Sequence, residues 1–294
     1  VVDMLFPAGS KGRIPIVAVT GTNGKTTTTR LNAHIAKTMG YKVGFTTSDG
    51  IYIQNRMMEK GDCTGPVSAK FVLMDPTIDY AVLECARGGL LKAGLAFDKC
   101  DISIVTNVTA DHIGLKDIDS VEEMAKVKSV VPETTRKEGY AILNADDDLV
   151  FDMRKNLECN LVLFSMDENN PRIKAHCERG GVAAVLEDGW VSIIKGTWKI
   201  RVEKVVNIPL TLGGKAAFMI QNILPCVAAA FVQNFKIEDL KLALNTFIPS
   251  PTMTPGRMNV FKFKHFEMLV DFAHNPDGFQ AISNYLAKVE MHPK

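Results

Sequence analysis

A glycine-rich stretch near the N-terminus, Thr20–Thr27 (T-G-T-N-G-K-T-T), contains residue types that bind the phosphates of a nucleotide. Backbone N–H groups of such a loop and of the following helix can cradle a polyphosphate. Lys25 would neutralise the β- and γ-phosphates, and the hydroxyl of Thr26 would bind Mg²⁺. The strict P-loop pattern has glycine at position 19, where this sequence has Val19, so a tighter loop is expected. The residues predicted to bind ATP here are Gly21, Thr22, Asn23, Gly24, Lys25, Thr26 and Thr27.

Further candidates for metal binding and catalysis follow apolar segments. Glu84 comes at the end of Ala81-Val82-Leu83, and ligands of parallel sheets collect beyond the carboxyl ends of strands. We therefore expect Glu84 near the Mg²⁺ of the nucleotide. His112 follows another apolar segment, and Lys126 lies fourteen residues later in a predicted helix. A turn-capping Glu, a surface His and a solvated Lys are the ordinary alternatives, and Asp111 is expected to fix the loop.

These residues must be positioned by strands and helices that alternate over the first 150 residues, the pattern of a parallel sheet covered by helices. Leu31, Ile35 and Met39 share one face of a predicted helix over about Thr26–Met39. A second helix is predicted over Val121–Val131. Strands are predicted at Ile14–Thr20, Tyr41–Thr47, Ala81–Cys85, Ile102–Val108, Tyr140–Asn144 and Leu161–Ser165. The fold class is α/β, with a doubly wound, mostly parallel sheet and a P-loop.

The sequence pattern changes from about Pro171 to Gly214, where Gly-containing turns separate short apolar runs and predict a small attached antiparallel sheet. Its strands are expected at Ala183–Leu186, Trp190–Ile194 and Trp198–Val202, and helices are expected at about Lys215–Asn234 and Ile237–Thr246. Pro249–Gly256 is a Pro-rich linker. We expect residues 1–250 to form a central ATP-binding domain and 257–294, with strands at Val260–Phe263 and Met268–Phe272, to be the truncated start of a second α/β domain.

Composition excludes several classes of protein. The 294 residues are 46% hydrophobic and 23% charged, as in globular proteins, and the net charge of +1 does not point to a nucleic-acid-binding surface. No apolar run approaches the roughly 20 residues that span a bilayer. Six cysteines without a C-x-x-C pair predict mostly buried thiols, no zinc cluster and a cytoplasmic location. The start, Val1-Val2-Asp3, has neither Met nor a signal peptide, which indicates a trimmed chain.

Several motifs, in order, resemble those of the Mur ligases and folylpolyglutamate synthetases. They are G-T-N-G-K-T-T, the strand-end Glu84, T-N-V-x-x-D-H, the lysine that follows, Met219–Asn222, Pro255–Arg257 and Asp271–Pro276. Other stretches are similar to the C-terminal half of the cyanophycin synthetase family within this group. They are Thr46–Ile53, Gly61–Pro66 and Leu83–Leu90.

The resemblance implies an ATP-dependent amide ligase that forms ADP and an acyl phosphate, which an amine then captures. The implied partners are ATP, arginine and the aspartate side chains of an aspartate-backbone polymer (cyanophycin). The implied metal is Mg²⁺, held by Thr26, Glu84, His112 and a carbamylated Lys126, and the implied catalytic residues are Lys25, Glu84, His112 and Lys126. Lys128 competes with Lys126 for carbamylation.

The roles of further site residues are implied by the resemblance alone. Asn222 would contact adenine, Arg257 a phosphate and Asp271 the ribose, whereas His274 and Asn275 match the same motif without a defined role. The residues expected to shape the acceptor pocket are Asp49, Thr64 and Arg87.

Other functions remain open. One is a Mur-type ligase that acts on a cell-wall peptide or a folate, and another is a non-catalytic P-loop module that binds ATP. We expect the isolated chain to turn over poorly, and homo-oligomerisation is expected through a longer chain.

Overall fold

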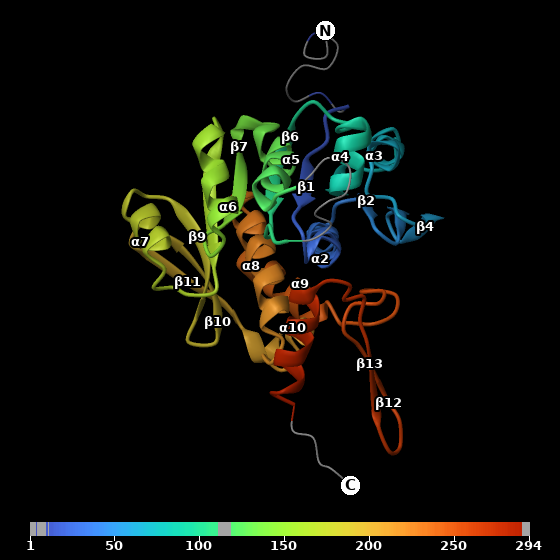
Figure 1. The fold of residues 1–294 in the computed structure, drawn as a ribbon. Coiled ribbons are helices and arrows are strands. Elements are labelled where there is room, and N and C mark those ends of the chain that lie inside the picture. The colour runs from blue at the N-terminus through green and yellow to red at the C-terminus, as the bar shows by residue number, and fades with distance from the viewer. Residues whose placement is uncertain (1–3, 5–9, 11, 111–118, 290–294) are drawn as a thin grey trace.

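The structure, a computed structural model, describes Met4, Ser10 and residues 12–110 and 119–289. Eleven strands of the described residues form one sheet. Their bounds are β1 Ile16–Thr20, β2 Val43–Thr47, β3 Gly50–Ile53, β4 Arg56–Lys60, β5 Tyr80–Glu84, β6 Cys100–Val105, β7 Thr135–Asn144, β8 Asn160–Ser165, β9 Val182–Glu187, β10 Trp190–Lys195 and β11 Trp198–Lys204. The spatial order is β11-β10-β9-β8-β7-β6-β1-β5-β2-β3-β4. In Figure 1 the sheet runs from β11 at the left to β4 at the right.

The centre of the sheet is parallel and its two ends are antiparallel. Strand β1 pairs in parallel with β5 on one side and β6 on the other, and the parallel region continues to β2 and to β9. The carboxyl ends of β1, β5 and β6 therefore meet at one edge of the sheet, where ligands of such folds bind. The hairpins β2-β3-β4 and β9-β10-β11 extend the two ends.

Helices cover both faces of the sheet. Their bounds are α2 Lys25–Thr38, α3 Pro66–Leu73, α4 Arg87–Ala93, α5 Val121–Glu133, α6 Asp148–Asp152, α7 Pro171–Glu178, α8 Ala217–Val232 and α9 Ile237–Thr246. Val17 and Val19 of β1 pack in the cluster that contains α2, α8 and α9, whereas Ile16 and Ala18 pack on the other face. Because successive side chains of a strand point to opposite faces, a strand covered on both sides is apolar throughout.

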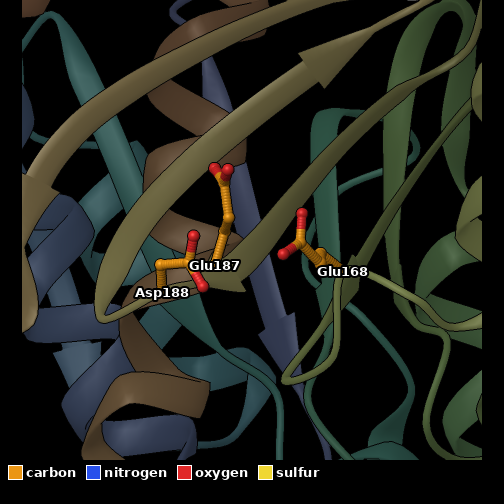
Figure 2. A group of neighbouring side chains, drawn as sticks. All are labelled: Glu168, Glu187 and Asp188. Carbon is orange, nitrogen blue, oxygen red and sulfur yellow. The ribbon is translucent and has the colours of Figure 1, made fainter.

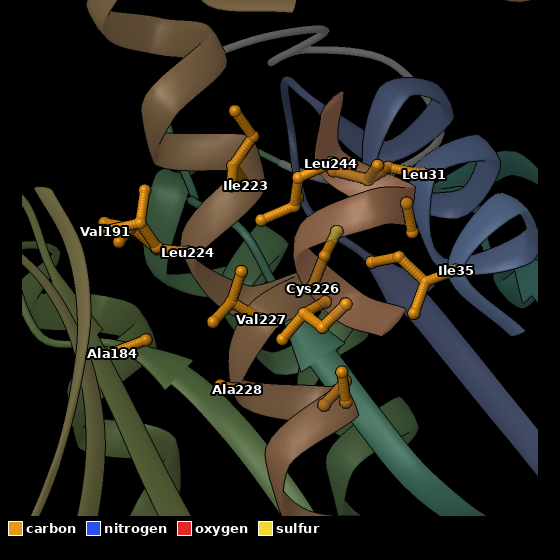
Figure 3. Close-up of a cluster of buried hydrophobic side chains, with 14 of the residues drawn as sticks. Leu31, Ile35, Ala184, Val191, Ile223, Leu224, Cys226, Val227, Ala228 and Leu244 are labelled. Atoms are coloured by element: carbon orange, nitrogen blue, oxygen red, sulfur yellow. The ribbon is translucent and has the colours of Figure 1, made fainter. Parts of the chain in front are cut away.

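Helix α8 lies at the centre of the largest core cluster. Figure 3 shows Leu224 beside Val191 of the sheet, while Cys226 points toward Leu31 of α2 and Leu244 of α9. Apart from Gln221 and Asn222, the residues of the helix are apolar, because the helix is packed between the sheet and the helices α2 and α9. It thus fixes α2, and with α2 the loop that precedes that helix.

After the linker, the chain forms a separate two-stranded sheet and one helix. Strand β12 (Asn259–Lys262) pairs with β13 (Glu267–Val270), and α10 (Pro276–Leu286) follows. Figure 1 shows the β12-β13 hairpin extending away from the main sheet. Among the described residues, no helix has both the length and the apolar character needed to cross a membrane.

The predicted fold class, a doubly wound and mostly parallel α/β sheet, is confirmed. The antiparallel strands predicted after Pro171 are β9, β10 and β11, and they extend the main sheet because β9 pairs in parallel with β8. The pattern did not predict β3 and β4. Every residue of β4 is exposed, so the strand has no apolar alternation from which it could be recognised. The cysteines are free thiols and all but Cys159 are buried, as expected.

An acidic group lies at the β9–β11 end of the sheet. Figure 2 shows the carboxylates of Glu168, Glu187 and Asp188 close together, with oxygens within 4.8 Å of one another. Lys199 bonds Glu168 and Glu187, and Arg201 bonds Glu187 and Asp188. These two cations supply the positive charge that the group needs, so it stabilises the β9–β11 hairpins.

Shortening a side chain in the α8 core should destabilise the fold. Leu224 is fully buried, and Leu224→Ala should lower the free energy of unfolding by about 2–5 kcal/mol, because it leaves a cavity between α8 and the sheet. Leu242→Ala is the matched control, because Leu242 on α9 is 54% exposed and its loss should change stability by at most about 0.5 kcal/mol. Urea unfolding of both variants measures the difference, and equal losses would contradict the proposed packing.

The acidic group should make stability depend on pH. Burial raises the pKa of Glu187, but hydrogen bonds from Arg201, Lys199 and Ser192 outweigh burial and lower the pKa to about 2. The stabilisation is therefore complete above the ordinary pKa of 4.5 and is lost as the pH falls towards 2. Glu187→Gln should melt below the wild type at pH 7, and the difference should shrink below pH 4.5. The exposed Glu178→Gln is the control, and a Glu187→Gln deficit that is independent of pH would refute the assignment.

Candidate functional site

The phosphate loop lies between β1 and α2 and is held by the end of β6. Backbone N–H groups of Thr22 and Asn23 donate to the carbonyl and side-chain oxygens of Asn107, both at 2.8 Å. The Thr106 hydroxyl donates to the Asn23 carbonyl at 2.7 Å. Lys25 Nζ bonds the Thr22 carbonyl at 2.7 Å, so its charge lies over the loop. The loop therefore has a fixed shape with a cation above it.

Two glycines of the loop are required by space and by backbone conformation. Gly24, the N-cap of α2, has φ +85°, and a Cβ there would lie 2.1 Å from Oδ1 of Asn222. Gly21 has φ +144°, and a Cβ there would lie 1.9 Å from the Thr106 hydroxyl. A side chain at either position would be strained and would displace a neighbour.

Thr26 and Glu84 are in direct contact at the carboxyl ends of the central strands. The Thr26 hydroxyl donates to Glu84 Oε2 at 2.9 Å, and the backbone N–H of Ser48 lies 3.3 Å from the same oxygen. The Ser48 hydroxyl is 3.0 Å from that of Thr26. Glu84 is only 3% exposed; burial raises its pKa, and the charge of Lys25 and the Thr26 hydrogen bond oppose that rise. A buried carboxylate beside hydroxyls is a donor set that suits Mg²⁺.

Of the two lysines considered on α5, Lys128 faces the phosphate loop. Its Nζ donates to the Gly21 carbonyl at 2.8 Å, and Lys128 is 4% exposed. Lys126 is exposed, and its place beside the metal stays a prediction. The buried face of α5 also carries Met124 and Val131, four residues before and three after Lys128, and position 126 lies off that face. The other predicted metal ligand, His112, and its neighbour Asp111 lie outside the described residues.

The loop opens into a cleft of about 690 Å³, a size that suits a nucleotide. Its lining comes from the phosphate loop, the ends of β5–β7, α8 and the segment after the linker. Asn222 lines it from α8, and Arg257 and Asp271 line it from the far side. Asp271 accepts from the Met258 N–H at 2.9 Å, and the Arg257 guanidinium lies 4.6 Å from the centre of the Phe272 ring. The structure thus brings the three predicted nucleotide contacts around one cleft.

Of the three residues predicted to shape the acceptor pocket, one lines the cleft and two do not. Thr64 lines the cleft, where its hydroxyl bonds Asp62, whereas Arg87 begins α4 and is not among the residues that line it. Asp49 lies outside the cleft lining, and its carboxylate is bound by Arg30, Tyr52 and Thr47. Burial opposes ionisation of Asp49, but these partners hold its pKa below the ordinary value.

Arg30 is the centre of that buried network. It projects from α2, and its guanidinium lies 4.6 Å from the centre of the Tyr52 ring. It also donates to the backbone carbonyls of Thr252 and Met253 at 3.4 Å, in the Pro-rich linker. Arg30 therefore joins the helix of the phosphate loop to the β2–β3 turn and to the linker.

Sequence reasoning missed several residues of the site. Asn107 and Ser48 follow the ends of β6 and β2, a position that could have marked them once the sheet order was known. Asp146, Asp147 and Asp148 follow β7 and also line the cleft. Asp147 caps α6 and accepts from the Val108 N–H at 2.7 Å, so part of this acidic run is structural.

Known proteins with a similar fold include ligases of the Mur and folylpolyglutamate synthase families. The chain matches the Mur ligase middle domain family over residues 19–230. A solved UDP-N-acetylmuramoyl-L-alanyl-D-glutamate–2,6-diaminopimelate ligase has a TM-score of 0.69 at 20% identity, over 98% of this chain and 56% of the other. A bifunctional folylpolyglutamate synthase/dihydrofolate synthase, solved with Mn, AMPPNP and L-glutamate bound, has a TM-score of 0.66 at 19% identity, over 95% of this chain and 67% of the other.

In sequence, the chain is more similar to cyanophycin synthetases than to these two solved structures. A cyanophycin synthetase from Geminocystis herdmanii is 54% identical over 286 residues, which are 97% of this chain and 33% of the relative. The chain thus spans about one third of the length of the curated relatives it matches. Given the parallel sheet, the phosphate loop and the family match over most of its length, the chain belongs to the Mur ligase family.

Proposed function

We propose that this chain forms the ATP-binding and phosphoryl-transfer centre of an amide ligase that adds arginine to aspartate side chains of an aspartate-backbone polymer. The observation that carries the proposal is the Thr26–Glu84 contact beside the loop, with the Lys25 ammonium above it. The folylpolyglutamate synthase neighbour, solved with an ATP analogue and Mn, supports nucleotide and divalent-metal binding by this fold.

In the proposed reaction, a carboxylate oxygen of the acceptor attacks the γ-phosphorus of ATP. The bond between that phosphorus and the β–γ bridging oxygen breaks, which gives ADP and an acyl phosphate. The amine of arginine then attacks the acyl carbon, loses a proton and displaces phosphate, which leaves an amide. Because two anions meet in the first step, the site must supply positive charge, and Lys25 lies over the loop that would hold the phosphates.

The residues present fit a magnesium ion. Thr26 and Glu84 would hold it through a hydroxyl and a carboxylate oxygen, and the ion would neutralise charge on the nucleotide. The raised pKa of Glu84, caused by burial, indicates a carboxylate that gains stability from a nearby cation. His112 as a ligand of a second ion stays a prediction.

We propose that the carbamylated lysine is Lys128 rather than Lys126. A carbamate converts the ammonium of a lysine to a carboxylate, which could contribute to a metal site. Lys128 is supported as the candidate because it is buried and its Nζ bonds the Gly21 carbonyl, whereas Lys126 faces solvent. Asn222, Arg257 and Asp271 are proposed to hold the base, a phosphate and the ribose.

The identity of the substrates rests on similarity to the cyanophycin synthetases alone. The acceptor roles of Asp49, Thr64 and Arg87, the domain boundary at the linker, a cytoplasmic location and oligomerisation stay predictions. So does the expectation that the isolated chain turns over poorly.

Ligation can be tested in the longest natural chain that contains these residues. With ATP, Mg²⁺, an aspartate-backbone primer and mixed amino acids, the primer should gain one arginine for each ADP formed. Primer mass and nucleotide products are measured together, and Lys25→Ala should abolish both. ADP without a gain in mass would contradict the proposed acceptor. Arginine-independent ligation to a cell-wall peptide or a folate would support the alternative ligase function, and the absence of both products would refute the ligase.

The two lysines of α5 offer a matched pair of variants. Lys128→Met should lower kcat about a hundredfold, because it removes the proposed carbamate and the hydrogen bond to the Gly21 carbonyl of the phosphate loop. Lys126→Met should change kcat less than about twofold, because that side chain is exposed. NMR after growth on ¹³C-bicarbonate should show a carbamate signal that is lost only in Lys128→Met. Loss of the signal and of activity in Lys126→Met instead would restore Lys126 to the site.

A further inference from the structure

A reciprocal pair of side-chain amides joins the phosphate loop to the start of α10, 252 residues further along the chain. Asn275 Nδ2 donates to Asn23 Oδ1 at 2.9 Å, and Asn23 Nδ2 lies 3.4 Å from Asn275 Oδ1. Asn275 is only 5% exposed. It is not among the residues that line the nucleotide cleft, whereas Asn23 is. Asn275 can therefore act on a ligand in the cleft through Asn23 or through the start of α10, where Gly278 lines the cleft.

Asn275 is itself held in place by the helix it begins. Its Oδ1 accepts from the Gly278 N–H at 2.9 Å, so the side chain is the N-cap of α10. Ile282 and Tyr285 of the same helix pack against the core cluster of α8. The amide that reaches Asn23 is therefore presented by a capped and packed helix.

The backbone of Asn23 is bound from the opposite direction. Its N–H donates to Asn107 Oδ1 at 2.8 Å, and its carbonyl accepts from Thr106 at 2.7 Å and from Asn107 at 3.2 Å. Asn23 is thus held between the end of β6 and the start of α10. The following residue, Gly24, has the positive φ on which the shape of the loop depends.

From this geometry we infer that Asn275 is a positioning residue that fixes Asn23, and thereby sets the phosphate loop for the nucleotide. The inference rests on the proposed function in that the loop binds ATP. Because coupling between two sites is reciprocal, nucleotide in the loop also stabilises the docking of α10. The segment after the linker thus contributes to ATP binding through a residue that does not line the cleft.

Asn275→Ser separates the two roles of the side chain. Serine is a good N-cap and can still accept from the Gly278 N–H, but it is too short to exchange hydrogen bonds with Asn23. Asn284→Ser is the matched control, because Asn284 lies on the same helix, is exposed and bonds only within it, to Gln280. Asn23→Ala and the Asn23→Ala/Asn275→Ser double variant complete a thermodynamic cycle.

The experiment uses the longest natural chain that contains these residues and has two readouts. The first is amide hydrogen exchange of Thr22 and Asn23 without nucleotide, which Asn275→Ser should accelerate about fivefold and Asn284→Ser should not change. The second is the Kd of a non-hydrolysable ATP analogue with Mg²⁺, which Asn275→Ser should raise about five- to tenfold. In the Asn23→Ala background, Asn275→Ser should have no further effect on that Kd.

The outcomes separate this inference from the proposed function. Unchanged exchange and an unchanged Kd in Asn275→Ser would overturn the positioning role, while the wild type still binds nucleotide. An equal rise in Kd with or without Asn23 would overturn it as well, since the effect would not pass through Asn23. If the wild type binds no ATP analogue, the proposed function fails and the role in ATP binding fails with it. Hydrogen exchange then reports only whether the amide pair holds the empty loop.

Discussion

A carboxylate buried at the end of a central strand is the constraint on which the rest of this site depends. Glu84 is removed from water, so its charge must be stabilised by groups that the fold brings to it. Thr26 and Ser48 provide two hydrogen bonds and Lys25 a positive charge; Lys25 and Thr26 begin α2, whereas Ser48 follows β2. The parallel register, in which Val19 of β1 lies opposite Glu84 of β5, aligns these segments. A shift in register would separate the carboxylate from its partners.

The phosphate loop depends on packing that lies well away from it. Helix α8 fills the main core cluster with its apolar residues, and the same helix presents Asn222 next to Gly24. Helix α5 buries Met124 and Val131 and presents Lys128 to Gly21. Because these helices serve the core and the site at once, loosening of the core would also loosen the site.

The sequence was sufficient to predict the parallel core of the fold and the phosphate loop, because buried strands and a Gly-rich turn leave strong local patterns. It could not predict that Lys128 rather than Lys126 faces the loop, since that depends on how α5 is rotated against the sheet. Nor could it predict that Asp49 is bound by Arg30, which requires two segments to meet in space. Ser48 and Asn107 became recognisable only when the sheet order placed their strand ends at one edge.

The hydrogen bonds between Arg30 and the linker constrain which residues of this region can change during evolution. Arg30 bonds the linker through the main-chain carbonyls of Thr252 and Met253, which every amino acid possesses. The exposed Thr252 can therefore change its side chain without losing the contact, whereas the Met253 side chain also packs against the main core cluster. Arg30 has no such freedom, because a planar guanidinium makes several directed hydrogen bonds at once and lies over the Tyr52 ring, which lysine cannot reproduce. We expect sequence drift at Thr252 and strict retention of Arg30.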